Sequence, residues 1–403
     1  ESLTSINKNQ ISSVIIDFNK HEKVNPIKDT NASILTHMLT TFSNLEYLNF
    51  CPSSIWNYRL FFWNPYPHIS SSTLLELHIS LIRFTDCLYI LDGRFIKLQS
   101  LHVDINSISI PLSKLININQ EKLPNLRSFS LYCGMATTAY DKLILPLLQR
   151  MSNLENLRLN ILVYDKNQFI DGNDLKENIL NHMLQLERFE FYICSDFYFY
   201  NQIDFPSKED IQYTFKDFKS DQVICYIDYF EENQRSLCHI YSYPYILKYY
   251  DIITNNFPGG LFKYVREVEL YDERPFEHEF FLQIVQSFPF IKELSIKNLK
   301  PQNKKFCKES ENNKYDFMII KYSYLTNLTL YYAHDDYIEE FLIDTNICLP
   351  NNSLHLNINY EQRKRVTHNF TRDLTRINCA KLNSLCLNGD QLPIYAKDYF
   401  PQL

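Results

Sequence analysis

The chain has 403 residues, of which 45% are hydrophobic and 22% are charged, and its formal net charge is −7. This composition is typical of a folded protein and excludes wholesale disorder. The negative charge argues against a dedicated nucleic-acid-binding protein, which normally presents a basic face. No uninterrupted apolar run is long enough to span a bilayer. From the charge and from this absence, we expect neither nucleic acid nor a membrane as a partner. A chain of this length is too long to fold around one ordinary compact hydrophobic core. The length therefore favours a barrel or an elongated repeat array.

One phrase recurs along the chain, N-L-x-x-Φ-x-L, in which Φ is an apolar residue. It is clearest at 125–131 and 153–159. Side chains alternate between the two faces of a strand, so the apolar residues at the fourth and sixth positions share one face. No single copy can bury that face alone, and the copies are therefore expected to stack. This is the signature of a leucine-rich repeat.

The copies lie about 24 to 34 residues apart, near or beyond the usual period of such repeats. Each interval is long enough for the crossover that joins two parallel strands. A gap without the phrase separates two blocks of copies, and the copy at Leu354 is imperfect. In chain order the copies begin at Ile11, Leu45, Leu74, Leu98, Leu126, Leu154 and Leu186, and then at Val265, Ile291, Leu325, Leu354 and Leu382.

Helices are expected between several of these strands. Asn31 is able to cap the first of them, and Pro146 predicts a kink in the second. A polar tract at 300–314 predicts a loop, and Asn388-Gly389 predicts a turn after the last copy. The expected helices cover 31–41, 141–151, 174–185, 275–288 and 336–343.

The gap between the two blocks, at about 197–262, is rich in Phe and Tyr. Strands are expected in it over 223–229 and 236–243, where β-branched and aromatic residues are frequent. One interpretation is an aromatic core that fills an irregular part of the array. The other is an insertion that binds a ligand.

These patterns predict an α/β fold, a leucine-rich-repeat solenoid with irregular insertions. Its curved parallel sheet would form the concave face and its helices the convex face. Residues 1–196 would be an N-terminal repeat block, 197–262 an aromatic-rich degenerate repeat or insertion, and 263–403 a C-terminal repeat block. Together they would make one continuous solenoid.

No catalytic or metal-binding motif accompanies the repeats. Glycine is scarce, with six residues, and no phosphate-cradling loop is present. The ten cysteines contain no C-x-x-C pair, which favours reduced thiols in the cytoplasm or nucleus. The stretch 171–174 lacks the glutamate that a calcium loop requires, and is better interpreted as a turn that leads into a helix cap. We therefore predict no enzyme activity, no cofactor and no metal.

The third and fifth positions of each copy, and usually the seventh, point away from the core onto the expected concave face. Several of these positions are Tyr or Arg, which often contribute most of the binding free energy at protein interfaces. This face is therefore predicted to bind a protein. The alternative is a solvated face without a partner. The predicted binding residues are Glu76, His78, His102, Asp104, Tyr132, Arg158, Asn160, Arg188, Glu190 and Tyr192 in the first block, and Glu267, Glu269, Tyr271, Lys297 and Tyr331 in the second.

Three stretches, at 180–189, 241–245 and 288–294, resemble a divergent, Asn- and aromatic-rich group of F-box/leucine-rich-repeat proteins. The resemblance implies the substrate-recognition part of a cullin-type ubiquitin ligase, whose repeats hold a protein substrate. An F-box opens with an L-P-x-E-like phrase, which is not present in this chain. The chain begins at Glu1 rather than Met, which predicts a fragment or a processed product. The ligase adaptor is thus an expected partner only if an F-box precedes Glu1.

Two alternatives to the ligase function stay open at this point. One is a leucine-rich-repeat scaffold or receptor unconnected to ubiquitin. The other, from a different class, is an enzyme whose site lies in the 197–262 insertion, which a cluster of ionisable groups in a pocket there would favour.

Overall fold

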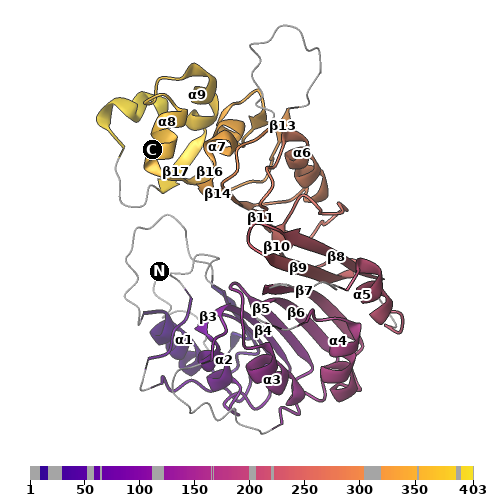
Figure 1. Ribbon diagram of the computed structural model, residues 1–403. Coiled ribbons are helices and arrows are strands. Elements are labelled where there is room, and N and C mark those ends of the chain that lie inside the picture. Colours follow the sequence, from indigo (N-terminus) through magenta and orange to yellow (C-terminus); the bar gives the residue numbers. More distant parts are fainter. Residues whose placement is uncertain are drawn as a thin grey trace. The chain divides into compact units, whose positions relative to one another are not determined.

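The computed structural model describes residues 10–16, 30–51, 59–63, 66–110, 122–164, 166, 168–198, 206–218, 222–303, 319–351, 354–386 and 392–402 (Figure 1). The chain forms two compact units. The first comprises Glu1–Ile227 with Arg235–Pro244, and the second comprises Asp228–Gln234 with Tyr245–Leu403. The boundary between the units therefore lies within the aromatic-rich segment 197–262.

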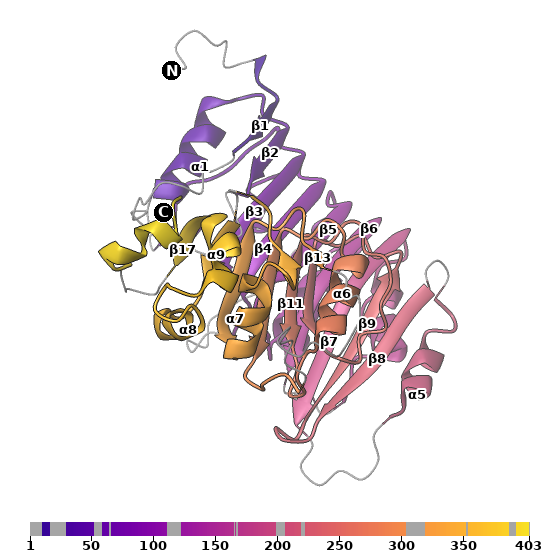
Figure 2. The same ribbon diagram turned by 90° about the horizontal axis from the view of Figure 1, so that it is seen from above.

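The first unit contains a sheet whose strands β1 to β7 lie side by side in chain order and are all parallel (Figure 2). The strand β9 then pairs antiparallel with β7, and β8 lies next to β9. The strands are β1 Ser13–Ile15, β2 Tyr47–Phe50, β3 Glu76–Arg83, β4 Ser100–Ser107, β5 Ser128–Cys133, β6 Asn156–Tyr164, β7 Arg188–Tyr198, β8 Gln222–Phe230 and β9 Arg235–Tyr243.

Helices α1 to α4 lie along one face of this sheet (Figure 1). Two expectations about them need correction. Asn31 lies inside the first helix, which begins at Thr30, and the helix expected over 174–185 ends early and continues as a short 3₁₀ turn. The helices are α1 Thr30–Thr41, α2 Phe84–Ile90, the π-helical turn η4 Tyr140–Ile144, α3 Leu145–Gln149, α4 Gly172–Asn178, the 3₁₀ turn η5 Leu180–His182 and α5 Lys208–Thr214.

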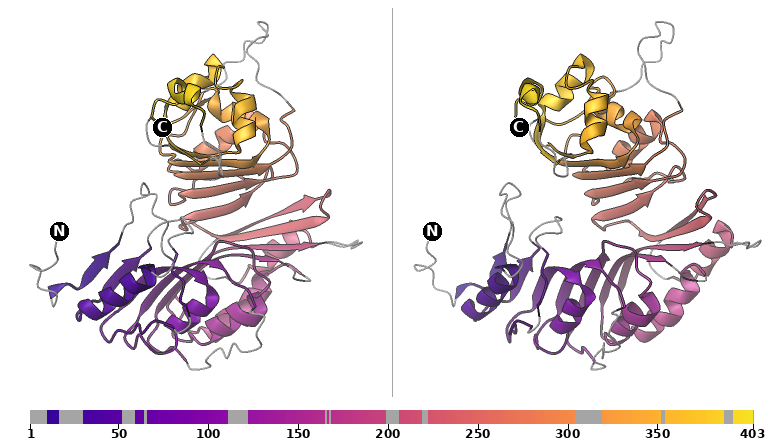
Figure 3. Two further views of the ribbon diagram at one scale, coloured as in Figure 1. Left: turned by 90° about the vertical axis from the view of Figure 1, so that its left-hand side faces the viewer. Right: turned by 60° about the vertical axis from the view of Figure 1, so that its left-hand side comes forward.

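The second unit has the same two layers, with a parallel sheet covered on one face by α6 to α9 (Figure 3). Its strands are β10 Tyr249–Ile253, β11 Glu267–Tyr271, β12 Glu293–Asn298, β14 Asn327–Ala333, β16 Leu354–Asn357 and β17 Leu382–Cys386, with a separate pair, β13 Ile320–Lys321 and β15 Ile347–Cys348. Its helices are α6 His278–Ser287, α7 Asp335–Leu342, α8 Tyr360–Val366, α9 Asp373–Ala380 and the 3₁₀ helix η6 Ile394–Tyr399.

These arrangements confirm the predicted α/β class with largely parallel sheets. The strands form two main sheets instead of the single curved sheet that we expected. The physical reason is that β9 runs antiparallel to β7, which ends the consecutive parallel pairing. The expected turn at Asn388-Gly389 and most of the expected loop at 300–314 lie outside the described residues. Among the described residues, no helix is both long and apolar enough to cross a lipid bilayer.

The repeated phrase forms a strand because its apolar residues stack from one copy to the next. In β4, β5 and β6, the buried residues Leu101, Phe129 and Leu157 lie directly opposite one another in the register. Two residues later along each strand, the next apolar residue is also buried. A continuous apolar layer therefore forms between the sheet and the helices, which no single copy could bury alone.

Backbone hydrogen bonds repeat with the same period. Just before β2 to β7, β11, β12 and β14, one carbonyl of the preceding copy accepts hydrogen bonds from two successive amides of the next copy, at 2.8–3.2 Å. The leading Asn of the phrase adds a second contact of this kind. The Asn125 side-chain amide donates to the Ile96 carbonyl at 2.7 Å, and the Asn153 side-chain amide donates to the Pro124 carbonyl at 3.0 Å. In these two copies, the leading Asn thus joins the copy to the preceding one.

Four aromatic residues of the 197–262 segment pack with Phe288 into a buried cluster in the second unit. Phe262 is at its centre, with its ring centroid 5.0–5.7 Å from those of the other four. All five side chains are buried. This packing supports the interpretation of the segment as an aromatic core. The members of the cluster are Tyr245, Tyr250, Phe257, Phe262 and Phe288.

We expect Phe262→Ala to lower the free energy of unfolding of the second unit by about 3–5 kcal/mol, because it leaves a cavity in this cluster. Tyr264 is a matched control, since it lies two residues later and is 58% exposed. Tyr264→Ala should change the free energy by no more than about 0.5 kcal/mol. Native-state hydrogen exchange of the amides in β10 to β12 measures both values. Equal losses in the two variants would contradict a packed aromatic core.

Candidate functional site

The face of the first sheet that points away from α1–α4 is called the open face below. Along each of β2 to β6, buried apolar residues alternate with half-buried residues, which lie on this face. Register pairing arranges the half-buried residues in rows that cross the strands. One row contains Tyr47, Glu76, Ser100, Ser128 and Asn156, and the next contains Asn49, His78, His102, Ser130 and Arg158.

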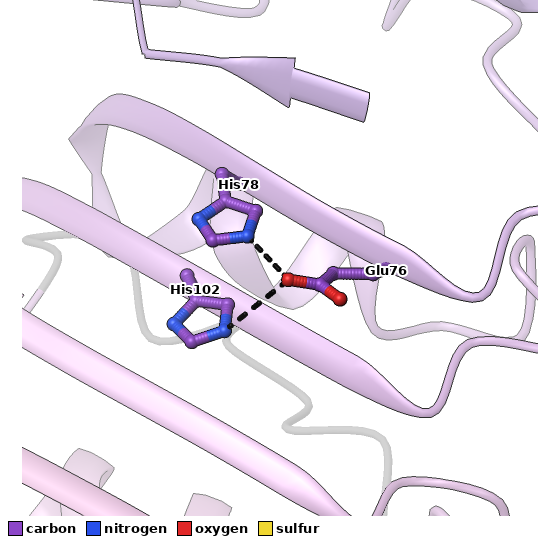
Figure 4. Close-up of side chains that lie close together, drawn as sticks. All are labelled: Glu76, His78 and His102. Carbon is purple, nitrogen blue, oxygen red and sulfur yellow. Dashed lines mark hydrogen bonds and ion pairs between the residues drawn. The ribbon is translucent and has the colours of Figure 1, made fainter. Parts of the chain in front are cut away.

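Three of the predicted binding residues come together on the open face, from β3 and β4 (Figure 4). His78 and His102 are paired in the register, and their rings stack with centroids 4.1 Å apart and an interplanar angle of 8°. His78 Nε2 lies 2.6 Å from Glu76 Oε1, and His102 Nε2 lies 3.9 Å from the same oxygen. Ser100 Oγ is 3.2 Å from His102 Nε2. The sequence spacing did not reveal this cluster, because His102 lies one repeat beyond the other two residues.

The environment of His102 disfavours its charged form. Burial lowers the pKa of His102 to about 4, with a further lowering from His78 and Arg158 that Glu76 only partly opposes. The imidazole of His102 is therefore neutral at neutral pH. A neutral ring can accept or donate a hydrogen bond, or bind a metal, without first losing a proton.

Asp104 and Arg158 are engaged in ion pairs. Arg59 Nη1 lies 2.7 Å from Asp104 Oδ1, and both side chains are largely buried. Arg158 Nε donates to Glu190 Oε2 at 2.5 Å, and Arg188 Nε lies 3.7 Å from Glu190 Oε1. Arg59 was missed by the sequence analysis because it lies outside the repeated phrase, where no periodic signal marks it.

Three predicted binding residues are buried instead of exposed. Glu190 is buried beneath its arginine partners Arg158 and Arg188, which are more exposed, and Asn160 lies between Tyr132 and Tyr192 in one row. The Tyr192 hydroxyl lies 3.0 Å from His239 Nδ1 of β9. The physical reason is the antiparallel pairing of β9 with β7, which gives Tyr192 neighbours that the repeat pattern did not predict. Tyr132 is half-buried and Arg188 is exposed, as expected for an open face.

In the second unit, the predicted residues also lie in rows and are mostly paired. Glu267 and Glu269 form ion pairs of 2.6 Å with Lys248 and Lys297, respectively. The ring of Tyr271 meets that of Phe230 edge-on at 5.5 Å. Tyr331, which was predicted for the same face as Lys297, is half-buried, and a register shift places the exposed Tyr332 opposite Lys297. This face of the second sheet therefore carries fixed ion pairs.

The pKa of His102 predicts a pH dependence of stability. An unfolded histidine has a pKa near 6.5, so between about pH 6.5 and about pH 4 the unfolded chain binds a proton that the folded chain does not. The contribution of the neutral His102 ring to the free energy of unfolding is complete above about pH 6.5 and is lost as the pH falls toward about 4. We expect His102→Gln to weaken the pH dependence of the free energy of unfolding over this range.

Urea unfolding at about pH 7 and about pH 5 gives the comparison. His182→Gln is the control, because His182 is exposed. A pH dependence that is the same in His102→Gln and in the native chain would contradict a depressed pKa of His102.

Comparisons with known proteins do not assign a family or a function to this chain. No protein-family model matches the sequence, and no curated protein matches it significantly. What the chain binds is therefore inferred from its own residues and their arrangement.

Proposed function

We propose that this chain is a non-catalytic protein-binding module of leucine-rich-repeat type, and that the open face of the first sheet receives the bound protein. The observation that carries this proposal is the row arrangement of that face. Half-buried Tyr, His, Ser and Arg side chains from consecutive parallel strands lie side by side at the strand spacing. A parallel sheet with one face uncovered by helices is unusual unless that face binds something.

The side-chain chemistry of the face suits a protein partner. The ion pair of Arg158 with Glu190 and the stacked pair of His78 and His102 hold polar groups in fixed positions. Preorganised polar and aromatic groups lose little conformational entropy when a partner binds. Tyr132, which lies in the next row, adds the kind of large, half-exposed side chain that is enriched at interface centres.

The resemblance to F-box/leucine-rich-repeat proteins extends this proposal. In such a protein, the repeats would hold a substrate for a cullin-type ubiquitin ligase, and an F-box upstream of Glu1 would contact the ligase adaptor. In the aromatic segment, Asp228 accepts hydrogen bonds from Thr254 and Asn256. This carboxylate therefore contributes to the packing of the second unit.

Two arginine substitutions test the binding face. Ser130 lies in the middle of the open face, and Gln149 is exposed in α3 on the opposite side of the sheet. We expect Ser130→Arg to lower the affinity for the bound protein by about tenfold or more, because it places a bulky charge within the interface. Gln149→Arg adds the same side chain and should leave binding unchanged.

The measurement is quantitative mass spectrometry of proteins that co-purify with the tagged full-length protein from its own cells. Proteins lost with Ser130→Arg and retained with Gln149→Arg would identify the partner. An identical set of captured proteins for both variants would contradict binding through the open face. Absence of a cullin and its adaptor from the native capture would refute the ligase part of the proposal alone.

A further inference from the structure

The side chains of Glu76, His78 and His102 form a compact group of metal-ligating type. Their potential ligand atoms all lie within 4.8 Å of one another. Both imidazoles direct Nε2 at the same carboxylate oxygen of Glu76 (Figure 4). Each side chain is partly accessible, with exposed fractions of 38% for Glu76, 23% for His78 and 21% for His102. An ion could thus reach the group from the solvent side of the sheet.

We propose that Glu76, His78 and His102 bind a zinc ion. Calcium and magnesium prefer oxygen ligands, whereas two imidazoles with one carboxylate are a common ligand set for zinc. This proposal departs from the sequence-based expectation of no metal, which considered spacing along the chain and not pairing across strands. It does not depend on the proposed protein-binding function.

The distances fit zinc with small side-chain movements. Zinc lies about 2.0–2.2 Å from imidazole nitrogen and carboxylate oxygen, so its ligand atoms are about 3.3–3.5 Å apart. The two nitrogens lie 2.6 Å and 3.9 Å from Glu76 Oε1, on either side of this range. The rings are nearly parallel, so at least one must tilt to aim its lone pair at a shared ion. The outer torsion of histidine has a broad minimum, which makes this tilt inexpensive.

The surroundings hold the group in place. Adjacent strands in register fix the backbone positions of His78 and His102. The Tyr47 ring packs against His78 at 5.4 Å. Ser100 Oγ lies 3.2 Å from His102 Nε2, a contact that zinc on this nitrogen would replace. The nearby cation Arg158 is neutralised by Glu190, which limits its repulsion of a metal ion. Three protein ligands leave one position of a tetrahedral zinc for water or for a group from a bound molecule.

Titration calorimetry of the purified full chain with zinc chloride, after removal of metals by a chelator, tests this site. We expect a zinc ion to bind at this site with an affinity that falls by at least about tenfold in His102→Ala and in Glu76→Gln, since the loss of an outer partner of a metal ligand already has an effect of that size. His355→Ala is the matched control. His355 is a half-buried strand histidine that also contacts a serine, Ser384, in the second sheet.

A loss of zinc binding must be distinguished from a loss of folding in His102→Ala and Glu76→Gln. Glu76→Gln preserves the shape of the side chain, and circular dichroism establishes that each variant is folded. Free thiols such as the exposed Cys51 also bind zinc, but that binding would be equal in all variants. Equal zinc affinity in the native chain, His102→Ala and Glu76→Gln would overturn the proposal, as would the absence of zinc binding to the native chain.

Discussion

A single backbone carbonyl accepts two successive amides of the next copy ahead of β2 to β7 in the first unit and ahead of β11, β12 and β14 in the second, and this pairing sets the register of these parallel strands. Hydrogen bonds of this kind contribute modestly one by one, but burying the strands without them would leave unpaired polar groups at every step. Once the register is set, the apolar residues of each copy stack on those of the preceding copy. The opposite face then becomes a set of rows whose members are about 4.8 Å apart across neighbouring strands.

Much of this arrangement could be predicted from the sequence, since it follows from local periodicity. The apolar positions of the repeated phrase coincide with the buried positions of β2 to β7, as Leu101 and Leu157 illustrate. The strands that form β8 and β9 were also predicted, because their β-branched and aromatic residues are a local signal. The helix expected over 174–185 was too long, since helix ends depend on tertiary packing more than on spacing.

The sequence could not predict features that arise from pairing between distant residues. The reversal of direction at β9 buries Tyr192 beside His239, although both lie in segments with clear strand patterns. The ion pair of Arg59 with Asp104 joins residues that are not related by the repeat. A register shift between β12 and β14 places Tyr332 opposite Lys297. Each case depends on a neighbour that no single segment specifies.

These differences limit the accessible area of the open face. Near β7, Glu190 and Tyr192 are buried and Arg188 is exposed, and the rest of the accessible part of the open face lies over β2 to β6. That part contains the stacked histidines and Glu76 at one side and Arg158 at the other.

The most direct measurement of the central claim is the spacing of positions within one row of the open face. Spin labels on Tyr47→Cys and either Ser128→Cys or Asn156→Cys, with the accessible native cysteines replaced by serine, would report this spacing through electron paramagnetic resonance. These residues are separated by three and four strand spacings, which predicts backbone distances of about 14 Å and about 19 Å. An increase of about 5 Å from the first pair to the second would support consecutive parallel strands in register. Equal distances, or a shorter distance for the second pair, would contradict them.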